Sequence, residues 1–303
     1  MSLAVRYPGM YDTILVPTDG SDGARRAVEH AALVAGAVDA TLHVVTVVDI
    51  DGAAGPFSAG GIDDDYVERL RAGGRETAAE TATLVEADVA VESDVLTGNP
   101  ADAILDYLDE YDVDMVCMGT HGRRGLQRYL TGSVAERVLR HAPVPVLTVR
   151  TTPESEVGDG YDEILVPTDG SDRAEAAVAH ALALGERFDS RIHAVSVVNV
   201  GDIPTGSESG LGESLLSELK STAGAATQRV AEEAEGAGLT AATSVTVGRP
   251  KGALLSYVED HDVDLVCMGT HGRTGLDRVL VGSTAEALVR RSPVPVLTVS
   301  AAD

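Results

Sequence analysis

Short apolar runs alternate along the chain with longer segments whose apolar residues recur at helical spacing. The runs are rich in β-branched residues, as in Thr41–Val48, and turn residues such as Gly98-Asn99-Pro100 separate them from the helical segments. Strands and helices in alternation predict a parallel sheet with helices on both faces. The elements expected in the first half are strands over 11–17, 41–48, 89–96, 114–118 and 143–149, and helices over 23–37, 63–87, 100–111 and from 133 onward.

The same succession of motifs occurs twice. Asp19 and Asp169 lie 150 positions apart, and so do Gly132 and Gly282. A repeat of this length is typical of a duplicated globular domain and too long for a solenoid unit. We therefore predict an α/β protein of two doubly wound, Rossmann-like domains, each with a five-stranded parallel sheet. The predicted organisation is an N-terminal extension over 1–10, a first domain over 11–150, a linker over 151–160 and a second domain over 161–303.

A glycine-bearing loop follows the fourth predicted strand of each half. Its spacing in the first half is Gly119-x2-Gly122-x9-Gly132-Ser133, and the second half keeps it. Backbone N–H groups of such a loop can approach a phosphate closely, and the dipole of the next helix favours negative charge. The turn after the first strand reaches the same edge of the sheet, where ligands of doubly wound folds bind. The loop predicts a nucleotide site, whereas Ser133–Glu136 also fits a capping box that needs no ligand.

Side chains near these loops have two interpretations each. The carboxylate of Asp19, like that of Asp169, suits ribose hydroxyls or a phosphate-bound Mg²⁺, and it equally suits a turn or helix cap. His121 is expected to shape the loop or contact a ligand, because no nucleophile, acid or base lies nearby in the sequence. Arg123 fits phosphate neutralisation or a solvated surface position, and the scarcity of positive charge favours phosphate.

Acidity dominates the charge of the chain. The net charge is −25, and Lys220 and Lys251 are its only lysines. Such a chain repels nucleic acid and anionic membranes, so we expect neither as a partner. The scarcity of lysine favours a halophilic protein over an ordinary acidic one. No apolar stretch approaches the roughly 18 residues of a membrane span, and the N-terminus has no signal-peptide pattern, which predicts a cytoplasmic protein.

Cysteine spacing and motif content give no indication of redox or catalytic chemistry. Cys117 and Cys267 occupy the same position in the two halves, inside an apolar run, without the spacing of a disulfide or metal site. We expect both to be packed thiols. The sequence has no Walker A loop, no Gly-x-Gly-x-x-Gly after the first strand and no Gly-x-Ser-x-Gly elbow. A dedicated catalytic apparatus is therefore not predicted.

Three motifs taken together resemble the universal stress protein family: Pro17-Thr18-Asp19-Gly20-Ser21, the glycine loop, and Pro143-Val144-Pro145-Val146. The second half matches at the same places, so the resemblance covers nearly the whole chain as a tandem member. It implies the adenine nucleotide alpha hydrolase-like fold. It also implies the ATP-binding branch, because both halves keep the full glycine motif. The implied cofactor of each domain is ATP, or AMP or ADP, with Mg²⁺ bound through the nucleotide at Asp19 and Asp169.

The resemblance further implies which positions surround the nucleotide. Pro17, Thr18 and Asp19 would line its adenosine end, with Val47 and Met118 near the base. Its ribose and phosphates would be surrounded by Gly119, His121, Gly122, Arg123, Gly132, Ser133 and Val134. The matching positions of the second domain are Pro167, Thr168, Asp169, Val197, Met268, Gly269, His271, Gly272, Arg273, Gly282, Ser283 and Thr284.

The expected function is stress-response sensing or regulation through adenine nucleotide binding, with slow ATP hydrolysis at most. One alternative is an ATP-hydrolysing or nucleotidyl-transferring enzyme on the same fold, and another is a non-catalytic scaffold with vestigial sites. Because the family dimerises through its last strand, the resemblance implies an intrachain pseudo-dimer through Val144–Val149 and Val294–Val299. Further homo-oligomers and a regulatory protein partner, which the sequence does not identify, are compatible with it.

Overall fold

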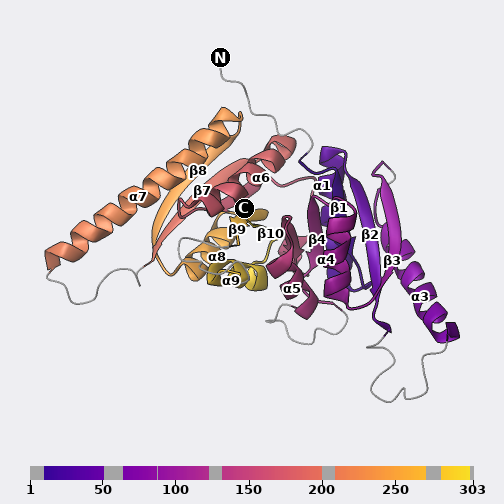
Figure 1. Cartoon of the computed structure of the whole chain (residues 1–303). Coiled ribbons are helices and arrows are strands. Elements are labelled where there is room, and N and C mark those ends of the chain that lie inside the picture. Colours follow the sequence, from indigo (N-terminus) through magenta and orange to yellow (C-terminus); the bar gives the residue numbers. More distant parts are fainter. Residues whose placement is uncertain are drawn as a thin grey trace. The chain divides into compact units, whose positions relative to one another are not determined.

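The structure is a computed structural model, and it describes residues 10–50, 64–86, 88–122, 132–199, 209–270 and 281–300 (Figure 1). The chain divides into two compact units. One unit, called the first domain below, comprises Gly9–Thr151 with Ser155–Val157. The second domain comprises Gly158–Asp303 with Thr152–Glu154.

The first domain is a parallel sheet of five strands in the order β3-β2-β1-β4-β5. Helix α3 packs on the sheet face that carries Val48, and α4 packs on the opposite face, which carries His43. This confirms the predicted doubly wound arrangement with helices on both faces. Its elements are β1 (Thr13–Pro17), α1 (Asp22–Val38), β2 (Thr41–Val48), α3 (Asp64–Ala82), β3 (Val91–Thr97), α4 (Pro100–Glu110), β4 (Met115–Gly119), α5 (Ser133–His141) and β5 (Val146–Val149).

The second domain repeats this topology, with strand order β8-β7-β6-β9-β10 and parallel pairing throughout. Its helix α7 is longer than the corresponding α3, and its buried residues lie in the C-terminal half of the helix. The elements are β6 (Glu163–Pro167), α6 (Asp172–Phe188), β7 (Arg191–Asn199), α7 (Ser209–Gly236), β8 (Thr240–Gly248), α8 (Pro250–Asp260), β9 (Leu265–Gly269), α9 (Ser283–Arg291) and β10 (Val296–Val299). A short 3-10 helix, η1 (Pro153–Ser155), lies in the linker.

Two element ends differ from the sequence pattern for local reasons. Helix α3 ends at Ala82 instead of continuing to residue 87, because the chain turns there through i→i+3 bonds such as Leu84 N to Thr81 O (3.1 Å). The two prolines of Pro143-Val144-Pro145 precede β5 and do not lie in it. Pro145 contributes only an acceptor, its carbonyl, to Val116 N (3.0 Å), as expected for a residue without an N–H group.

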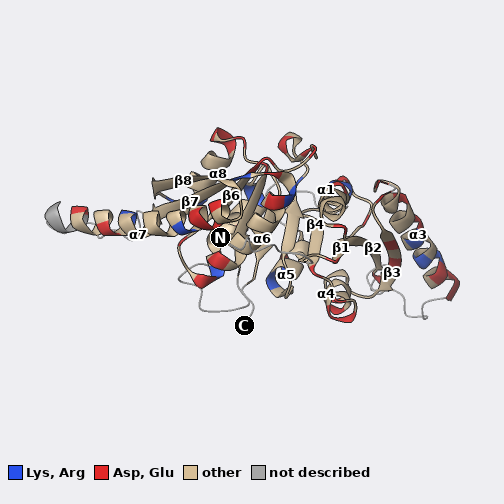
Figure 2. Ribbon diagram, turned by 90° about the horizontal axis from the view of Figure 1, so that it is seen from above, with Lys and Arg blue, Asp and Glu red and all other residues tan. Residues whose placement is uncertain are grey.

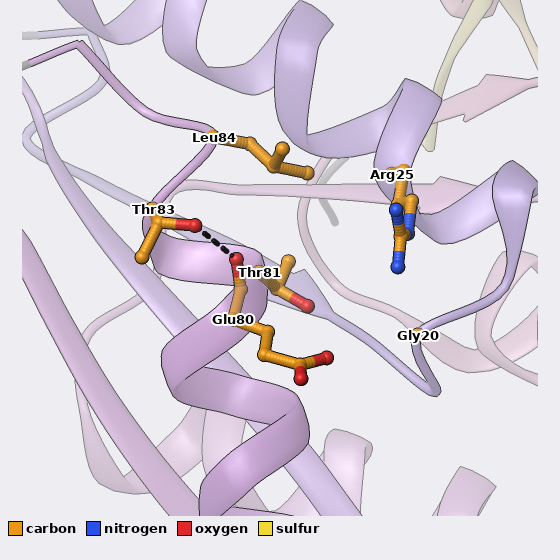
Figure 3. A pocket seen from close by; sticks show the side chains of 6 residues that line it. All are labelled: Gly20, Arg25, Glu80, Thr81, Thr83 and Leu84. Carbon is orange, nitrogen blue, oxygen red and sulfur yellow. Dashed lines mark hydrogen bonds between the residues drawn. The ribbon is translucent and has the colours of Figure 1, made fainter.

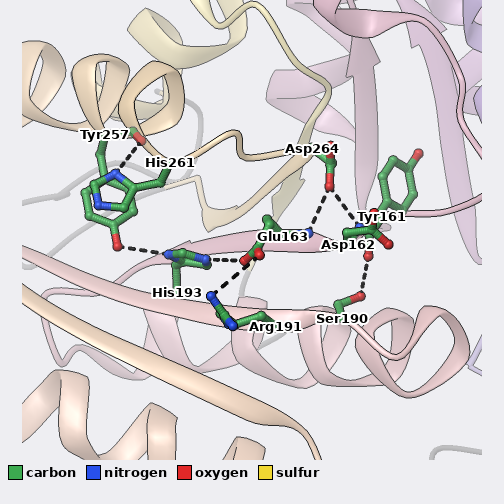
Figure 4. A network of polar contacts seen from close by, with 9 residues as sticks. All are labelled: Tyr161, Asp162, Glu163, Ser190, Arg191, His193, Tyr257, His261 and Asp264. Carbon is green, nitrogen blue, oxygen red and sulfur yellow. Dashed lines mark hydrogen bonds and ion pairs between the residues drawn. The ribbon is translucent and has the colours of Figure 1, made fainter.

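An aspartate fixes the first and fourth strands of each domain at their N-terminal ends. Asp114 Oδ2 accepts hydrogen bonds from the backbone N–H groups of Asp12 (2.8 Å) and Thr13 (2.9 Å). Asp264 makes the same pair of bonds to residues 162 and 163 (2.8 and 2.9 Å; Figure 4). Burial raises the pKa of Asp264, and these backbone bonds oppose the rise.

A buried histidine extends this network in the second domain (Figure 4). His193 Nδ1 lies 2.9 Å from the Tyr257 hydroxyl, and Nε2 lies 2.5 Å from the Glu163 carboxylate. The Tyr257 ring stacks on His261 at 3.8 Å between centroids. Because every polar atom of His193 has a partner within the fold, we assign this network to packing of α8 on β7.

Charged residues lie mostly on the helices, and the strands of the sheets carry few of them (Figure 2). Helices α3 and α7 present both acidic and basic residues along their length (Figure 2). Cys117 and Cys267 are fully buried in β4 and β9, which confirms that they are packed thiols, and burial raises the pKa of both. No helix in the described part of the chain is both long enough and apolar enough to cross a membrane.

His30, which is buried, and His180, which is partly buried, should make the protein acid-sensitive. Burial lowers the pKa of each from 6.5 to about 4, so the unfolded chain binds more protons between these values. The contribution of these histidines to the free energy of unfolding is therefore fully present above pH 6.5. It is lost as the pH drops toward 4, by at most about 3 kcal/mol for each histidine. Urea unfolding between pH 7 and pH 4.5 would measure this dependence.

The variant His30→Gln serves as the control, since glutamine can still donate to Ser155 O, which His30 Nε2 approaches at 3.0 Å, but cannot titrate. Its unfolding free energy should fall less steeply with decreasing pH than that of the original chain. Equal slopes for the two proteins would show that His30 does not contribute.

Candidate functional site

The turn between β1 and α1 is built by its own side chains. Thr18 N donates to Val45 O (2.8 Å), and Thr18 Oγ1 accepts from Gly20 N (3.1 Å). Asp19 Oδ1 accepts from Ser21 N (3.0 Å), and Ser21 caps α1 by accepting from its third residue. The turn role of Asp19 is thus present. The second domain repeats these bonds at Thr168, Asp169, Gly170 and Ser171.

The segment after β4 is held by the peptide group of Thr120. Its N–H donates to Val149 O (2.9 Å), and its carbonyl accepts from Gly132 N (2.7 Å). The end of β4 is thereby tied both to β5 and to the start of α5. In the second domain Thr270 makes the same two bonds, of 2.9 and 2.7 Å, to Val299 and Gly282.

The glycine loop meets the β1–α1 turn directly. A Cβ atom added at Gly122 would lie 2.4 Å from Asp19 Oδ2, and one added at Gly119 would lie 2.6 Å from the carbonyl carbon of Gly23. Each contact is possible only because glycine has no Cβ. The sequence left open whether these two segments meet, and the structure brings them together at the carboxyl edge of the sheet.

Helix α5 begins differently from the capping box predicted at Ser133. Gly132 is the N-cap residue, no side chain among the described residues caps the helix, and Ser133 is already its first helical residue. The reason is the bond from Gly132 N to Thr120 O, which fixes the cap one residue earlier. Glu136 instead pairs with Arg140 (2.7 Å). The second domain has the same arrangement, with Gly282 as the N-cap before Ser283 and an ion pair between Glu286 and Arg290.

His121 carries a buried nitrogen without a partner. Its Nδ1 atom lies 2.9 Å from the Thr120 hydroxyl, whereas Nε2 is buried and has no hydrogen-bond partner among the described residues. Leaving such a group unpaired costs about 1–3 kcal/mol. Buried polar atoms without partners are rare and call for an explanation, so Nε2 is a candidate contact for a ligand.

The other expected site residues lie at the same edge or outside the described residues. Pro17 is the last residue of β1 and pairs with Val45 of β2. Val47 lies two residues further along β2, and Met118 is buried in β4. Val134 is in the first turn of α5. The described residues contain no cluster of three or more His, Cys, Asp or Glu suited to a metal ion. Four of the expected residues are outside the described residues: Arg123, His271, Gly272 and Arg273. In the second domain the equivalent places are held by Pro167, Val197, Met268, Gly269 and Thr284.

The residues Gly23 and Thr120 were absent from the set predicted from the sequence. Thr120 could have been found, because Thr270 repeats it at the same position of the second half. Gly23 could not, because Arg173 occupies the equivalent position. The close approach of Gly23 to the loop is visible only in the folded chain.

Two doubly wound α/β domains with the same motifs define the class of this protein. A sequence model of the universal stress protein family matches residues 10–150 and again 160–300. The chain therefore belongs to the universal stress protein family, and it carries the domain of that family in tandem.

Some relatives match about half of this chain, and others match nearly all of it. A universal stress protein of Methanocaldococcus jannaschii is 37% identical over 142 residues, which cover 46% of this chain and 83% of that protein. One of Synechocystis is 25% identical over 307 residues, covering 94% and 98% of the two chains. The crystal structure of a universal stress protein from Archaeoglobus fulgidus matches with a TM-score of 0.70 at 24% identity, over 97% of this chain and 99% of that one. This last match supports the fold.

The two close contacts of the loop should differ in their response to alanine. Gly119→Ala places a Cβ against backbone that cannot move independently, so we expect a loss of about 1–3 kcal/mol in unfolding free energy. Gly122→Ala meets only the Asp19 side chain, which can rotate, and should cost less. Urea unfolding would measure both.

Gly158→Ala is a suitable control, because an added Cβ there meets no atom within 4 Å. Adding Asp19→Ala to Gly122→Ala should recover most of the smaller loss. A double variant as unstable as the sum of its single changes would contradict the contact between these two residues.

Proposed function

We propose that each domain binds an adenine nucleotide, either ATP or AMP or ADP, and that the chain belongs to the ATP-binding branch of its family. The observation that carries this proposal is the start of α5, which the Thr120 peptide holds beside the glycine loop and which no side chain in the described part of the chain caps. The N–H groups of such a first turn need acceptors, and the helix dipole favours an anion there. A nucleotide phosphate satisfies both requirements.

The roles of individual residues follow from their places. Gly132 and Ser133 would present N–H and hydroxyl groups to phosphate, and His121 Nε2 would form a hydrogen bond with a phosphate or ribose oxygen. Asp19 already accepts from Ser21 N through Oδ1, so its Oδ2, beside Gly122, is the atom assigned to a ribose hydroxyl or to nucleotide-bound Mg²⁺. The same roles are proposed for Gly282, Ser283, His271 and Asp169, with Arg123 and Arg273 as phosphate cations.

The biological role proposed is stress-linked sensing or regulation in the cytoplasm of a halophile. A net charge of −25 suits a salt-rich cytoplasm, where screening tolerates dense carboxylates. Hydrolysis is expected to be slow, because no described side chain pairs with His121 to make it a general base; its described side-chain partner is the Thr120 hydroxyl.

We also propose that the last strands, Val144–Val149 and Val294–Val299, pair within one chain as a pseudo-dimer. The support is the resemblance of both motifs to the strand through which family members dimerise. Size-exclusion chromatography with light scattering on each half expressed alone should show dimers. Two stable monomers with no tendency to pair would refute this proposal.

Nucleotide occupancy tests the main proposal. The chain, purified in high salt and then denatured, should release one adenine nucleotide for each of its two domains, identified by chromatography and mass. Gly132→Val should remove one of them, since a Cβ at this position already approaches Thr120 O at 3.2 Å. Calorimetry should show at least a roughly tenfold loss of affinity at that site, equal to about 1.4 kcal/mol.

Gly282→Val is the matched change in the second domain, and the double variant should release none while keeping its circular dichroism spectrum. Full occupancy in a folded double variant would contradict the proposed site. No released nucleotide, together with no heat on adding Mg-ATP, would favour the scaffold. Rapid ATP turnover that is lost in Asp19→Ala with Asp169→Ala would favour the enzyme.

A further inference from the structure

A pocket of about 260 Å³ lies beside the β1–α1 turn of the first domain, between α1 and α3 (Figure 3). This is below the roughly 300–1,000 Å³ of sites for drug-sized ligands, so it suits a smaller molecule. It is lined by Gly20, Arg25, Glu80, Thr81, Thr83 and Leu84.

Opposite charges enter this pocket from two helices. The guanidinium of Arg25 extends from α1 and the carboxylate of Glu80 from α3 (Figure 3). Neither side chain forms an ion pair within the described residues, although the chain has 48 acidic and only 23 basic residues. An arginine and a glutamate that line one space without pairing present complementary charges to a molecule that carries both signs.

Hydroxyl groups form the inner side of the pocket. Thr81 Oγ1 lies 3.1 Å from Thr18 Oγ1, so the pocket wall touches the turn of the proposed nucleotide site. The sheet register places Thr46 next to Thr18, on the face that α3 covers. Thr46 is only 7% exposed, and its hydroxyl has no partner among the described residues. Thr46 is not one of the residues that line the pocket, so its hydroxyl marks an incompletely bonded neighbour of the Thr18 turn and is not counted as a pocket contact.

The second domain keeps the turn and changes the lining. Glu175 stands at the position of Arg25, and its carboxylate pairs with Arg229 at 2.7 Å. Val230 and Ala231 replace Glu80 and Thr81. The equivalent region therefore has its arginine and glutamate paired with each other, and it lacks the carboxylate and the hydroxyl at the positions of Glu80 and Thr81, so it provides an internal control.

We propose that this pocket, in the first domain only, binds a small zwitterion of the free amino acid class. Arg25 takes the carboxylate of the ligand, Glu80 takes its ammonium group, and Leu84, 40% exposed, contacts its apolar part. Because Thr81 contacts Thr18, occupancy of the pocket also changes nucleotide affinity at the neighbouring site. This coupling rests on the proposed function, whereas zwitterion binding does not.

The test is a titration of the full chain with glycine, alanine, leucine, glutamate and lysine, followed by saturation-transfer NMR and calorimetry. Acetate and methylammonium serve as probes of each charge alone. At least one amino acid should bind saturably at one site per chain, and both single-charge probes should bind at least tenfold more weakly. Arg25→Gln and Glu80→Gln should each weaken amino acid binding at least tenfold, and Glu175→Gln should leave it unchanged.

Three outcomes overturn the proposal: no saturable binding by any amino acid, binding that neither first-domain variant weakens, or acetate binding as tightly as the amino acids. Circular dichroism confirms that each variant is folded. An ATP titration with and without the saturating amino acid then measures the coupling, which must be reciprocal. Amino acid binding without ATP binding refutes the proposed function alone, and ATP binding without amino acid binding refutes this inference alone.

Discussion

The peptide group of Thr120 is the constraint on which the candidate site depends. Its two hydrogen bonds join the end of β4 to β5 and to the start of α5, and Thr270 repeats them with the same lengths. Loops at the carboxyl edge of a doubly wound sheet are otherwise free to vary. These bonds fix where the helix N-terminus lies, and therefore where an anion is favoured in each domain.

Two glycines of the loop allow it to approach the β1–α1 turn. Residues with a Cβ at 119 or 122 would collide with Gly23 or Asp19 at 2.6 and 2.4 Å. The loop can therefore approach the β1–α1 turn closely enough for Asp19 and His121 to share one small region with the first turn of α5. His121 Nε2 and the start of α5 lie in that region, and within the described ranges neither has a side-chain hydrogen-bonding partner.

Duplication has kept the supports of the site and altered its surroundings. The turn bonds of Thr18 and Asp19 recur at Thr168 and Asp169 with equal lengths. In contrast, the residue four positions after Ser21, in α1, changes the sign of its charge, since Glu175 stands where the first domain has Arg25. The turn depends on a few hydrogen bonds, and both domains keep the residues that make them. The exposed residues around the turn are free to change, so two similar turns can have different surroundings.

The sequence by itself determined the repeat, the order of strands and helices, the buried thiols and the family. These properties follow from local periodicity and from motifs at fixed spacing, which fold the same way wherever they occur. Only the tertiary structure showed that Asp19 meets Gly122, that Gly132 rather than the serine after it caps α5, and that Arg25 and Glu80 share a pocket. Each of these depends on contacts between segments that are separated in the sequence. The cap, for example, lies one residue earlier than expected because Gly132 N bonds to the Thr120 carbonyl. Local pattern carries no information about such a partner.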